Sequence, residues 1–91
     1  MGFFALYSNV SGSNNIAIGN SALQNNTTNN NLAIGNNAAL NNTTGGVVAV
    51  GHEALKANTT GGANAAIGYM ALYSNTTSSN NTAVGSQALV S

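Results

Sequence analysis

The sequence contains no cysteine, and charged residues make up only 2% of its 91 positions. Without cysteine, neither a disulfide framework nor a thiolate metal site can form. One lysine, one glutamate and a formal net charge of zero give no electrostatic field that would attract phosphates, so nucleic acid is excluded as a partner. No apolar run approaches the roughly 18 residues of a membrane-spanning helix, so we expect no membrane insertion of this segment.

A repeat of 16 or 17 residues runs through the whole chain. Each copy contains an apolar residue, a glycine, two variable positions and an Ala-Leu pair, and one copy departs by placing Ala39 where leucine is expected. Repeats of this kind are typical of solenoids, in which each rung packs only on its neighbours. We therefore predict a single repeat domain over residues 1–91, and its rungs start near Gly2, Gly19, Gly35, Gly51, Gly68 and Gly85.

Each rung is expected to contain two short extended segments. The first is Ile16-Ala17-Ile18 and its counterparts, where alternation at period two places the flanking side chains on one face and the alanine on the other. The second is the Ala-Leu pair with the polar residues after it, as in residues 71–74. Helices between the glycines and the Asn-Thr clusters would be only about four to six residues long, too short to be stable. The expected fold class is therefore all-β, a β-solenoid or β-roll of about five rungs.

Ladders of like residues follow if successive rungs stack about 4.8 Å apart. An alanine recurs in the middle of every first segment, which indicates a place where only a methyl group fits: a narrow interior, or a close seam between chains. The larger apolar residues form a ladder that needs a core or another chain to cover it, so we expect a homo-oligomer. This ladder comprises Ile18, Ile34, Val50, Ile67, Val84, Leu23, Leu55, Leu72 and Leu89.

Pairs of threonines follow the glycine by eight and nine residues in four rungs, and three interpretations of them remain open. Their hydroxyls can hydrogen-bond locally where the rung turns, or they can form an outward ladder that binds ice or carbohydrate. As a third interpretation, the preceding asparagine can carry a glycan, because Asn26, Asn42, Asn58 and Asn75 begin acceptor sequons. The threonines are Thr27, Thr28, Thr43, Thr44, Thr59, Thr60, Thr76 and Thr77.

Acid–base chemistry would have to depend on the adjacent pair His52 and Glu53. We interpret both as outward-facing variable residues, and Glu53 as a weak surface partner of Lys56. Calcium-binding β-roll repeats need an aspartate in each turn, and the chain has none. We therefore expect no enzymatic activity, no metal and no cofactor. The positions equivalent to His52 and Glu53 hold Asn20-Ser21, Tyr69-Met70 and Ser86-Gln87.

Two units of the sequence resemble a known family. Residues 66–77 (AIGYMALYSNTT) and 81–89 (NTAVGSQAL) are similar to the head repeats of trimeric autotransporter adhesins and to related repeats of phage tail-fibre proteins. The resemblance covers essentially the whole chain, although the rungs are longer than the repeats of the adhesin heads. It implies a left-handed parallel β-roll, three chains around one axis and an exposed role in attachment.

The sequence therefore predicts a structural or adhesive repeat segment of an extracellular fibre at a cell or virion surface. The alternative is a solenoid that binds ice or carbohydrate through its Thr and Asn ladders. The expected partners are other copies of the chain and, from the resemblance, a host-surface glycan or matrix receptor. Because residues 2–8 and 85–91 occupy the same phase of the repeat, we also expect end-to-end stacking into a filament.

Overall fold

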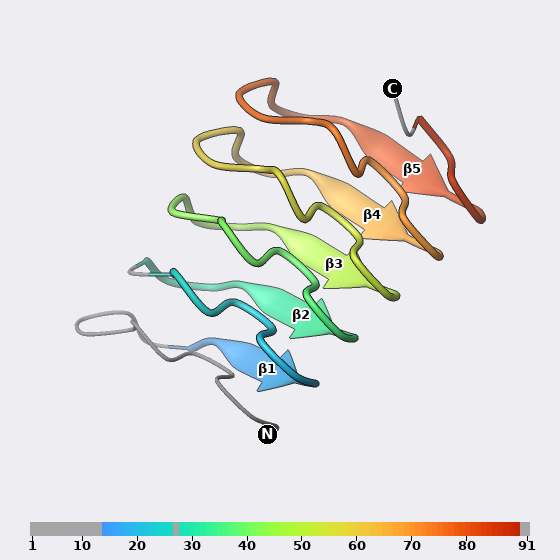
Figure 1. Cartoon of the computed structure of the whole chain (residues 1–91). Coiled ribbons are helices and arrows are strands. Elements are labelled where there is room, and N and C mark those ends of the chain that lie inside the picture. The colour runs from blue at the N-terminus through green and yellow to red at the C-terminus, as the bar shows by residue number, and fades with distance from the viewer. Residues whose placement is uncertain (1–13, 27, 90–91) are drawn as a thin grey trace.

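A computed structural model describes residues 14–26 and 28–89 of the chain (Figure 1). The strands pair in parallel, in the order of the sequence, and the chain makes one turn between each strand and the next. The expected all-β solenoid is therefore confirmed, whereas the start near Gly2 and the side chain of Thr27 lie outside the described residues. The five strands are β1 (Ile16–Ile18), β2 (Leu32–Ile34), β3 (Val48–Val50), β4 (Ala65–Ile67) and β5 (Thr82–Val84).

Equivalent residues of the repeat pair with one another along the sheet. Ala49, for example, pairs with Ala33 on one side and with Ala66 on the other. A shift by one residue would turn every inward alanine outward and drive the larger flanking residues into the interior. The repeat therefore fixes the register of all four strand pairs.

The other wall of each rung, which we call the turn wall, consists of consecutive turns, so the predicted second extended segment is wrong. The backbone N–H of Ala22 donates to the carbonyl of Gly19 in the same rung (3.2 Å), whereas that of Leu23 donates to Ala38 in the next rung (3.0 Å). Left-handed backbone at alternate residues curls the chain in this way, and leucine rarely adopts it. Positive φ angles of 50–54° recur at Leu23, Ala39, Leu55, Leu72 and Leu89.

The glycine after each strand is required by the close approach of successive rungs. Gly19 has a φ of 124°, which side chains rarely tolerate. A Cβ atom at this position would lie 2.7 Å from the backbone carbonyl carbon and oxygen of Gly35 in the next rung. Any side chain there would push the rungs apart, which explains why the repeat keeps a glycine.

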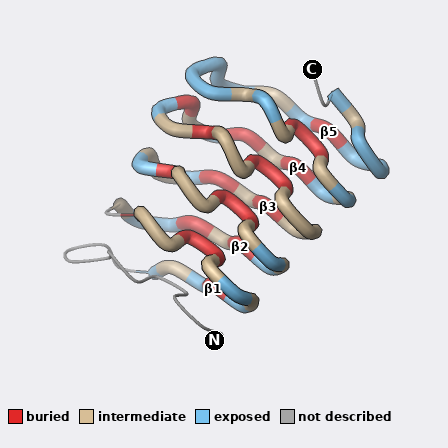
Figure 2. Tube along the Cα trace, in the orientation of Figure 1, coloured by how far each residue is buried: buried red, intermediate tan, exposed pale blue. Residues whose placement is uncertain are grey.

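The interior is narrow and is filled mainly by small side chains. The central alanine of every strand is at most 5% exposed, so this column lies in the interior and not at a seam between chains. Buried residues line both the sheet and the turn wall (Figure 2). The strand column is Ala17, Ala33, Ala49, Ala66 and Ala83, and the turn wall adds Ala22, Ala38, Ala54 and Ala71.

Candidate functional site

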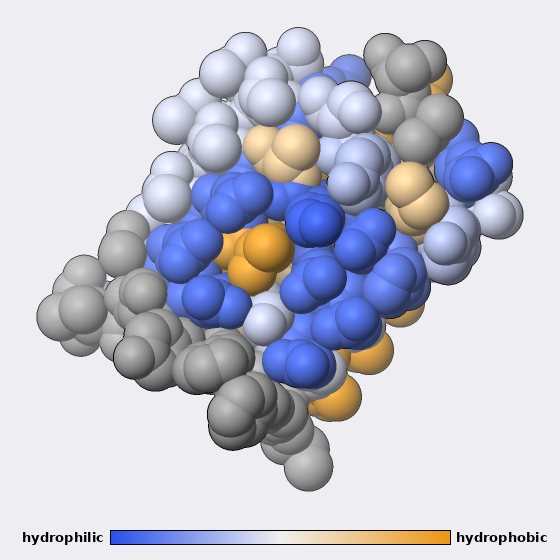
Figure 3. Space-filling view, in the orientation of Figure 1, coloured by the Kyte–Doolittle hydropathy of each residue, from blue (hydrophilic) through white to orange (hydrophobic). Residues whose placement is uncertain are grey.

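The outward side chains of β1–β5 form a largely apolar surface, which we call the sheet face. The first and third residues of each strand point outward because the central alanine points inward. Ile16 is 56% exposed, Ile67 43% and Val84 69%. In the view of Figure 3, hydrophilic residues cover most of the near side and hydrophobic side chains gather along one border. The sheet face comprises Ile16, Ile18, Leu32, Ile34, Val48, Val50, Ala65, Ile67, Thr82 and Val84.

The predicted core or interface ladder divides between two places in the structure. Its isoleucines and valines, residues 18, 34, 50, 67 and 84, all belong to the sheet face. Its leucines belong to the turn wall and point into the solenoid, except in the last described rung. Leu23, Leu55 and Leu72 are buried, and Leu89 is 61% exposed.

A column of buried asparagines, absent from the sequence-based expectations, runs along the solenoid beside the leucines. Nδ2 of Asn42 donates to Oδ1 of Asn26 (3.3 Å), Nδ2 of Asn58 to Oδ1 of Asn42 (2.7 Å), and Nδ2 of Asn75 to Oδ1 of Asn58 (2.8 Å). The asparagines recur at intervals of 16, 16 and 17 residues, as the glycines do, which marks them as equivalent positions of the repeat. Amides stacked in this way donate hydrogen bonds to one another and accept them. Their polar groups are therefore satisfied inside the narrow interior without water.

A second asparagine column, interrupted by Val47, ties three rungs to the backbone of the next. Oδ1 of Asn31 accepts the backbone N–H of Val47 (2.9 Å), and Oδ1 of Asn64 accepts that of Asn81 (2.9 Å). Among the described residues, no buried side-chain nitrogen or oxygen lacks a hydrogen-bond partner. The asparagines therefore act as internal cross-links between rungs.

In the folded chain, the nitrogen that would accept a glycan is inaccessible in three of the four sequons. Asn26, Asn42 and Asn58 are fully buried. Their Nδ2 atoms, to which a glycan would be attached, already donate to backbone carbonyls two or three residues ahead at 2.6–2.9 Å. The fourth, Asn75, is half-buried and donates to Asn58 and to the carbonyl of Ser78 (3.0 Å).

The threonines lie where the chain turns back toward the next strand, and several of their hydroxyls are used within the chain. Oγ1 of Thr43 donates to the carbonyl of Thr59 in the next rung (2.9 Å), and Oγ1 of Thr59 donates likewise to Thr76 (3.2 Å). Thr28 donates to Oδ1 of Asn26 (3.0 Å). The exposed threonines fall on different members of the pairs, so their exposure does not follow one column: they are Thr43, Thr60, Thr76 and Thr77, while Thr28, Thr44 and Thr59 are half-buried.

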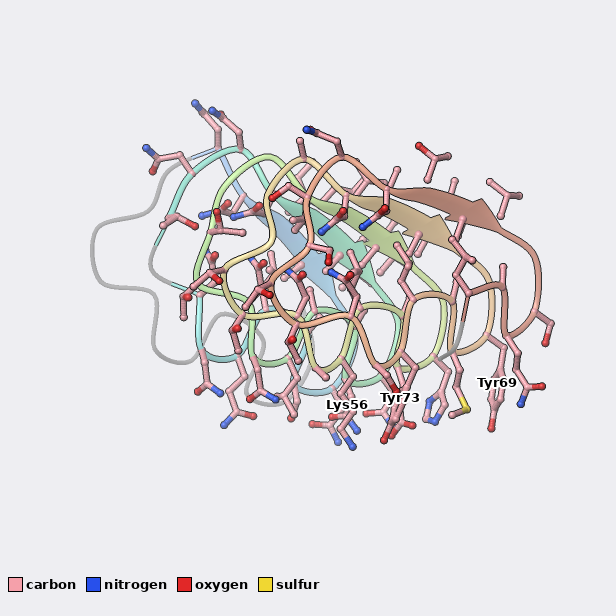
Figure 4. The ribbon with its side chains drawn as sticks, turned by 90° about the horizontal axis from the view of Figure 1, so that it is seen from above. Lys56, Tyr69 and Tyr73 are labelled. Carbon is pink, nitrogen blue, oxygen red and sulfur yellow. The ribbon has the colours of Figure 1, made fainter. Side chains whose placement is uncertain are left out.

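Aromatic and ionisable side chains gather on the turn wall, on two neighbouring rungs. The rings of His52 and Tyr69 are stacked, with centroids 5.4 Å apart and planes at 18°. Nζ of Lys56 lies 5.8 Å from the ring centroid of Tyr73. Figure 4 shows that Lys56, Tyr69 and Tyr73 point away from the solenoid on the side opposite the sheet. The outward orientation expected for position 52 is consistent with the 40% exposure of its side chain.

Glu53 lies beside this cluster and is paired. Its Oε2 atom is 3.4 Å from Nζ of Lys56 and accepts a hydrogen bond from Nδ2 of Asn37 (3.3 Å), so the expected pair with Lys56 is confirmed. Burial alone would raise the pKa of the Glu53 carboxyl. The hydrogen bond from Asn37 and the charge of Lys56, with a smaller contribution from His52, outweigh burial and lower this pKa below its ordinary value.

An open concavity of about 350 Å³ lies between the last two described rungs. Its lining contains hydroxyl, amide and apolar groups and no acid, base or thiol. In the described part of the chain, no three His, Cys, Asp or Glu residues come together as a metal site would require, and no helix is long and apolar enough to cross a membrane. The lining residues are Leu72, Ser74, Asn75, Thr76, Ser78, Asn81 and Leu89.

The surfaces available for function are thus the apolar sheet face and the variable turn wall. Comparison of the chain with protein-family models, with curated proteins and with solved structures finds no match.

Proposed function

We propose that the chain is a structural repeat segment of an extracellular fibre, exposed at a cell or virion surface. In this fibre three copies form left-handed rolls and pack around a common axis through their sheet faces. The resemblance to adhesin heads and phage tail-fibre repeats suggests this arrangement. The observation that carries it is the sheet face, which keeps large apolar side chains exposed on β1, β2, β4 and β5.

The sheet face can supply enough free energy for association only if several rungs act together. Covering an isoleucine that is half exposed contributes about 1 to 2 kcal/mol. Five large apolar residues of the sheet face are exposed, so the gross gain is on the order of 5 to 10 kcal/mol per chain. Association costs an estimated 4 to 15 kcal/mol. A segment of this length is therefore expected to associate moderately, and more rungs would strengthen the assembly.

Catalysis and ice binding are less well supported. His52 and Glu53 lie on an open surface and make a ring stack and an ion pair, and neither residue lines the concavity between the last two described rungs. The hydroxyl hydrogens of Thr43 and Thr59 are already donated to backbone carbonyls. A structural function requires neither a free acid–base pair nor free threonine hydroxyls. The proposed segment is therefore not an enzyme and works without a cofactor.

The oligomeric state tests the proposal. We expect light scattering across a dilution series to show a trimer that dissociates at low concentration, and the double variant Ile34→Thr/Ile67→Thr to shift the equilibrium toward a folded monomer. Threonine keeps the β-branched shape that strands favour and removes part of the apolar surface. Leu40→Gln on the turn wall, where the equivalent residue of another rung is Gln24, is the matched control and should leave the trimer intact. A folded, monodisperse monomer of 9.0 kDa at micromolar concentration would contradict the proposal.

A further inference from the structure

The turn wall contains two columns whose outward residues differ from rung to rung. Interior columns repeat the same few residue types, mainly alanine, leucine and asparagine, and the sheet face is mostly aliphatic, but no such restriction acts on these two columns. In the described rungs, aromatic and ionisable residues of these columns lie on two neighbouring rungs, and the other described members are amide, hydroxyl or aliphatic residues. The first column is Asn20, Asn36, His52, Tyr69 and Ser86, and the second is Gln24, Leu40, Lys56 and Tyr73.

A block of four residues, two on each of the two rungs, presents an aromatic surface to solvent. The block consists of His52, Lys56, Tyr69 and Tyr73. Since His52 and Tyr69 occupy equivalent positions of successive rungs, their stack runs along the solenoid and His52 covers one face of the Tyr69 ring. The backbone N–H of Gln87 donates to the carbonyl of Tyr69 (2.6 Å), which places Ser86 beside Tyr69 on the opposite side. Ser86 has a small, exposed side chain, and Tyr69 is 50% exposed. The second face of the tyrosine ring therefore borders an open ledge.

The charges and polar groups around the block define the ligand that it fits. Lys56 is paired with Glu53, so the block carries no net charge that would favour an anion. An exposed hydroxyl and an exposed amide side chain, those of Ser86 and Gln87, lie on the rung that borders the ledge. A sugar ring offers the matching chemistry: its C–H face packs on an aromatic ring, and its hydroxyls hydrogen-bond to amides and hydroxyls.

We infer that the turn wall around Tyr69 and Tyr73 binds a neutral oligosaccharide, with one sugar ring on the free face of Tyr69 and the chain continuing toward Tyr73. The inference deepens the proposed function and rests on it in one respect, because packing through the sheet faces is what leaves the turn wall on the outside of the fibre. Nucleic acid and acidic polysaccharide do not fit, since the described part of the wall has a single lysine and that lysine is paired.

Titration calorimetry of the oligomeric protein with chitohexaose, cellohexaose and maltohexaose, and with an acidic hexamer of galacturonate, tests the inference. We expect at least one neutral hexamer to bind and Tyr69→Asn to weaken it about tenfold, which is the loss expected for one aromatic stacking contact. Tyr73→Gln should weaken it by a smaller factor. Asparagine and glutamine occur in these two columns at Asn36 and Gln24, so both variants should fold. Leu40→Gln, on the same wall but outside the block, should bind as the unaltered chain does.

Three outcomes would overturn the inference: no neutral hexamer binds, only the galacturonate hexamer binds, or Tyr69→Asn binds the neutral hexamers unchanged. Light scattering on the same samples separates this failure from failure of the proposed function. A trimer that binds no sugar removes the inference and leaves the fibre proposal standing. A monomer that binds a neutral hexamer through Tyr69 removes the fibre proposal and leaves the sugar site.

Discussion

The sheet and the turn wall of each rung accept different kinds of sequence variation. On the sheet, the central residue is alanine in every rung and the third residue is isoleucine or valine. On the turn wall, one outward column holds asparagine, histidine, tyrosine and serine in turn. The difference arises because each sheet residue must fit between equivalent residues or into the interior, whereas an outward turn residue extends toward solvent and has room for side chains of different size. Four experiments test this contrast, from the largest expected effect to the smallest.

Gly35→Ala should be the most damaging of these substitutions. Gly35 has a φ of 132°, and a Cβ atom there would lie 2.5 Å from the carbonyl oxygen of Gly51. Backbone strain and this clash together should cost on the order of 3 kcal/mol or more, which a small domain can hardly tolerate. We expect loss of the cooperative thermal transition, while Asn36→Ala at the neighbouring exposed position should melt near the unaltered chain. Equal melting temperatures for the two variants would show that the rungs separate easily.

Ala49→Leu should destabilise the fold by up to about 3 kcal/mol, because it overpacks a column with no free space. Ala49 is completely buried between Ala33 and Ala66. The matched control is Asn20→Leu on the turn wall, where Leu40 already occupies the other outward column. Urea unfolding followed by circular dichroism should show a lower midpoint for Ala49→Leu only. An unchanged midpoint would mean that this column faces solvent.

Asn58→Ala should cost about 1 to 2 kcal/mol, because it removes the middle of the asparagine column. Asn58 accepts from Asn75 (2.8 Å) and donates to Asn42 (2.7 Å), so its loss removes the donor to Oδ1 of Asn42 and one of the two acceptors of Nδ2 of Asn75. Asn20→Ala, which changes an exposed asparagine, is the control in the same urea titration. If both variants unfold at the same urea concentration, the column contributes no net stability.

Glu53 should give the smallest effect, a few tenths of a kcal/mol that depends on pH. Because the pKa of Glu53 is lowered in the folded chain, its contribution is present above the unfolded-state pKa and is lost as pH falls through the folded-state pKa. The urea midpoint should therefore decrease slightly between about pH 5 and pH 3. Glu53→Gln should reduce this dependence, and an identical pH profile for the variant would show that the pair with Lys56 adds nothing.

The strands were predictable from sequence because their causes are local and repeated. An alanine between larger apolar residues specifies period two, and the glycine spacing sets the length of each rung, so β1 to β5 fall where the pattern places them. The turn wall was not predictable in the same way. Leu23 and Leu55 have positive φ angles that their own preferences disfavour, and only the hydrogen bonds to the next rung stabilise them there.

The candidate sites show the same division. The Ile and Val ladder could be identified from the repeat, but whether it faced the core or the outside could not, since alternation alone does not say which face is buried. The repeat indicates the threonines as a candidate ladder of hydroxyls, whereas the buried polar columns consist of asparagines such as Asn42 and Asn58. In an Asn-rich chain, repeated spacing alone does not distinguish a cross-link in the interior from a residue in a surface turn.

The repeat alone specifies a β-solenoid whose equivalent residues stack in one register, because like residues recur at a constant spacing. Tertiary structure decided three further features: the conformation of the turn wall, the asparagine columns and the stack of Tyr69 on His52. Each depends on contacts between residues 15 to 17 positions apart. Those contacts exist only after the chain has wound through a complete turn, so the preferences of a single rung cannot specify them.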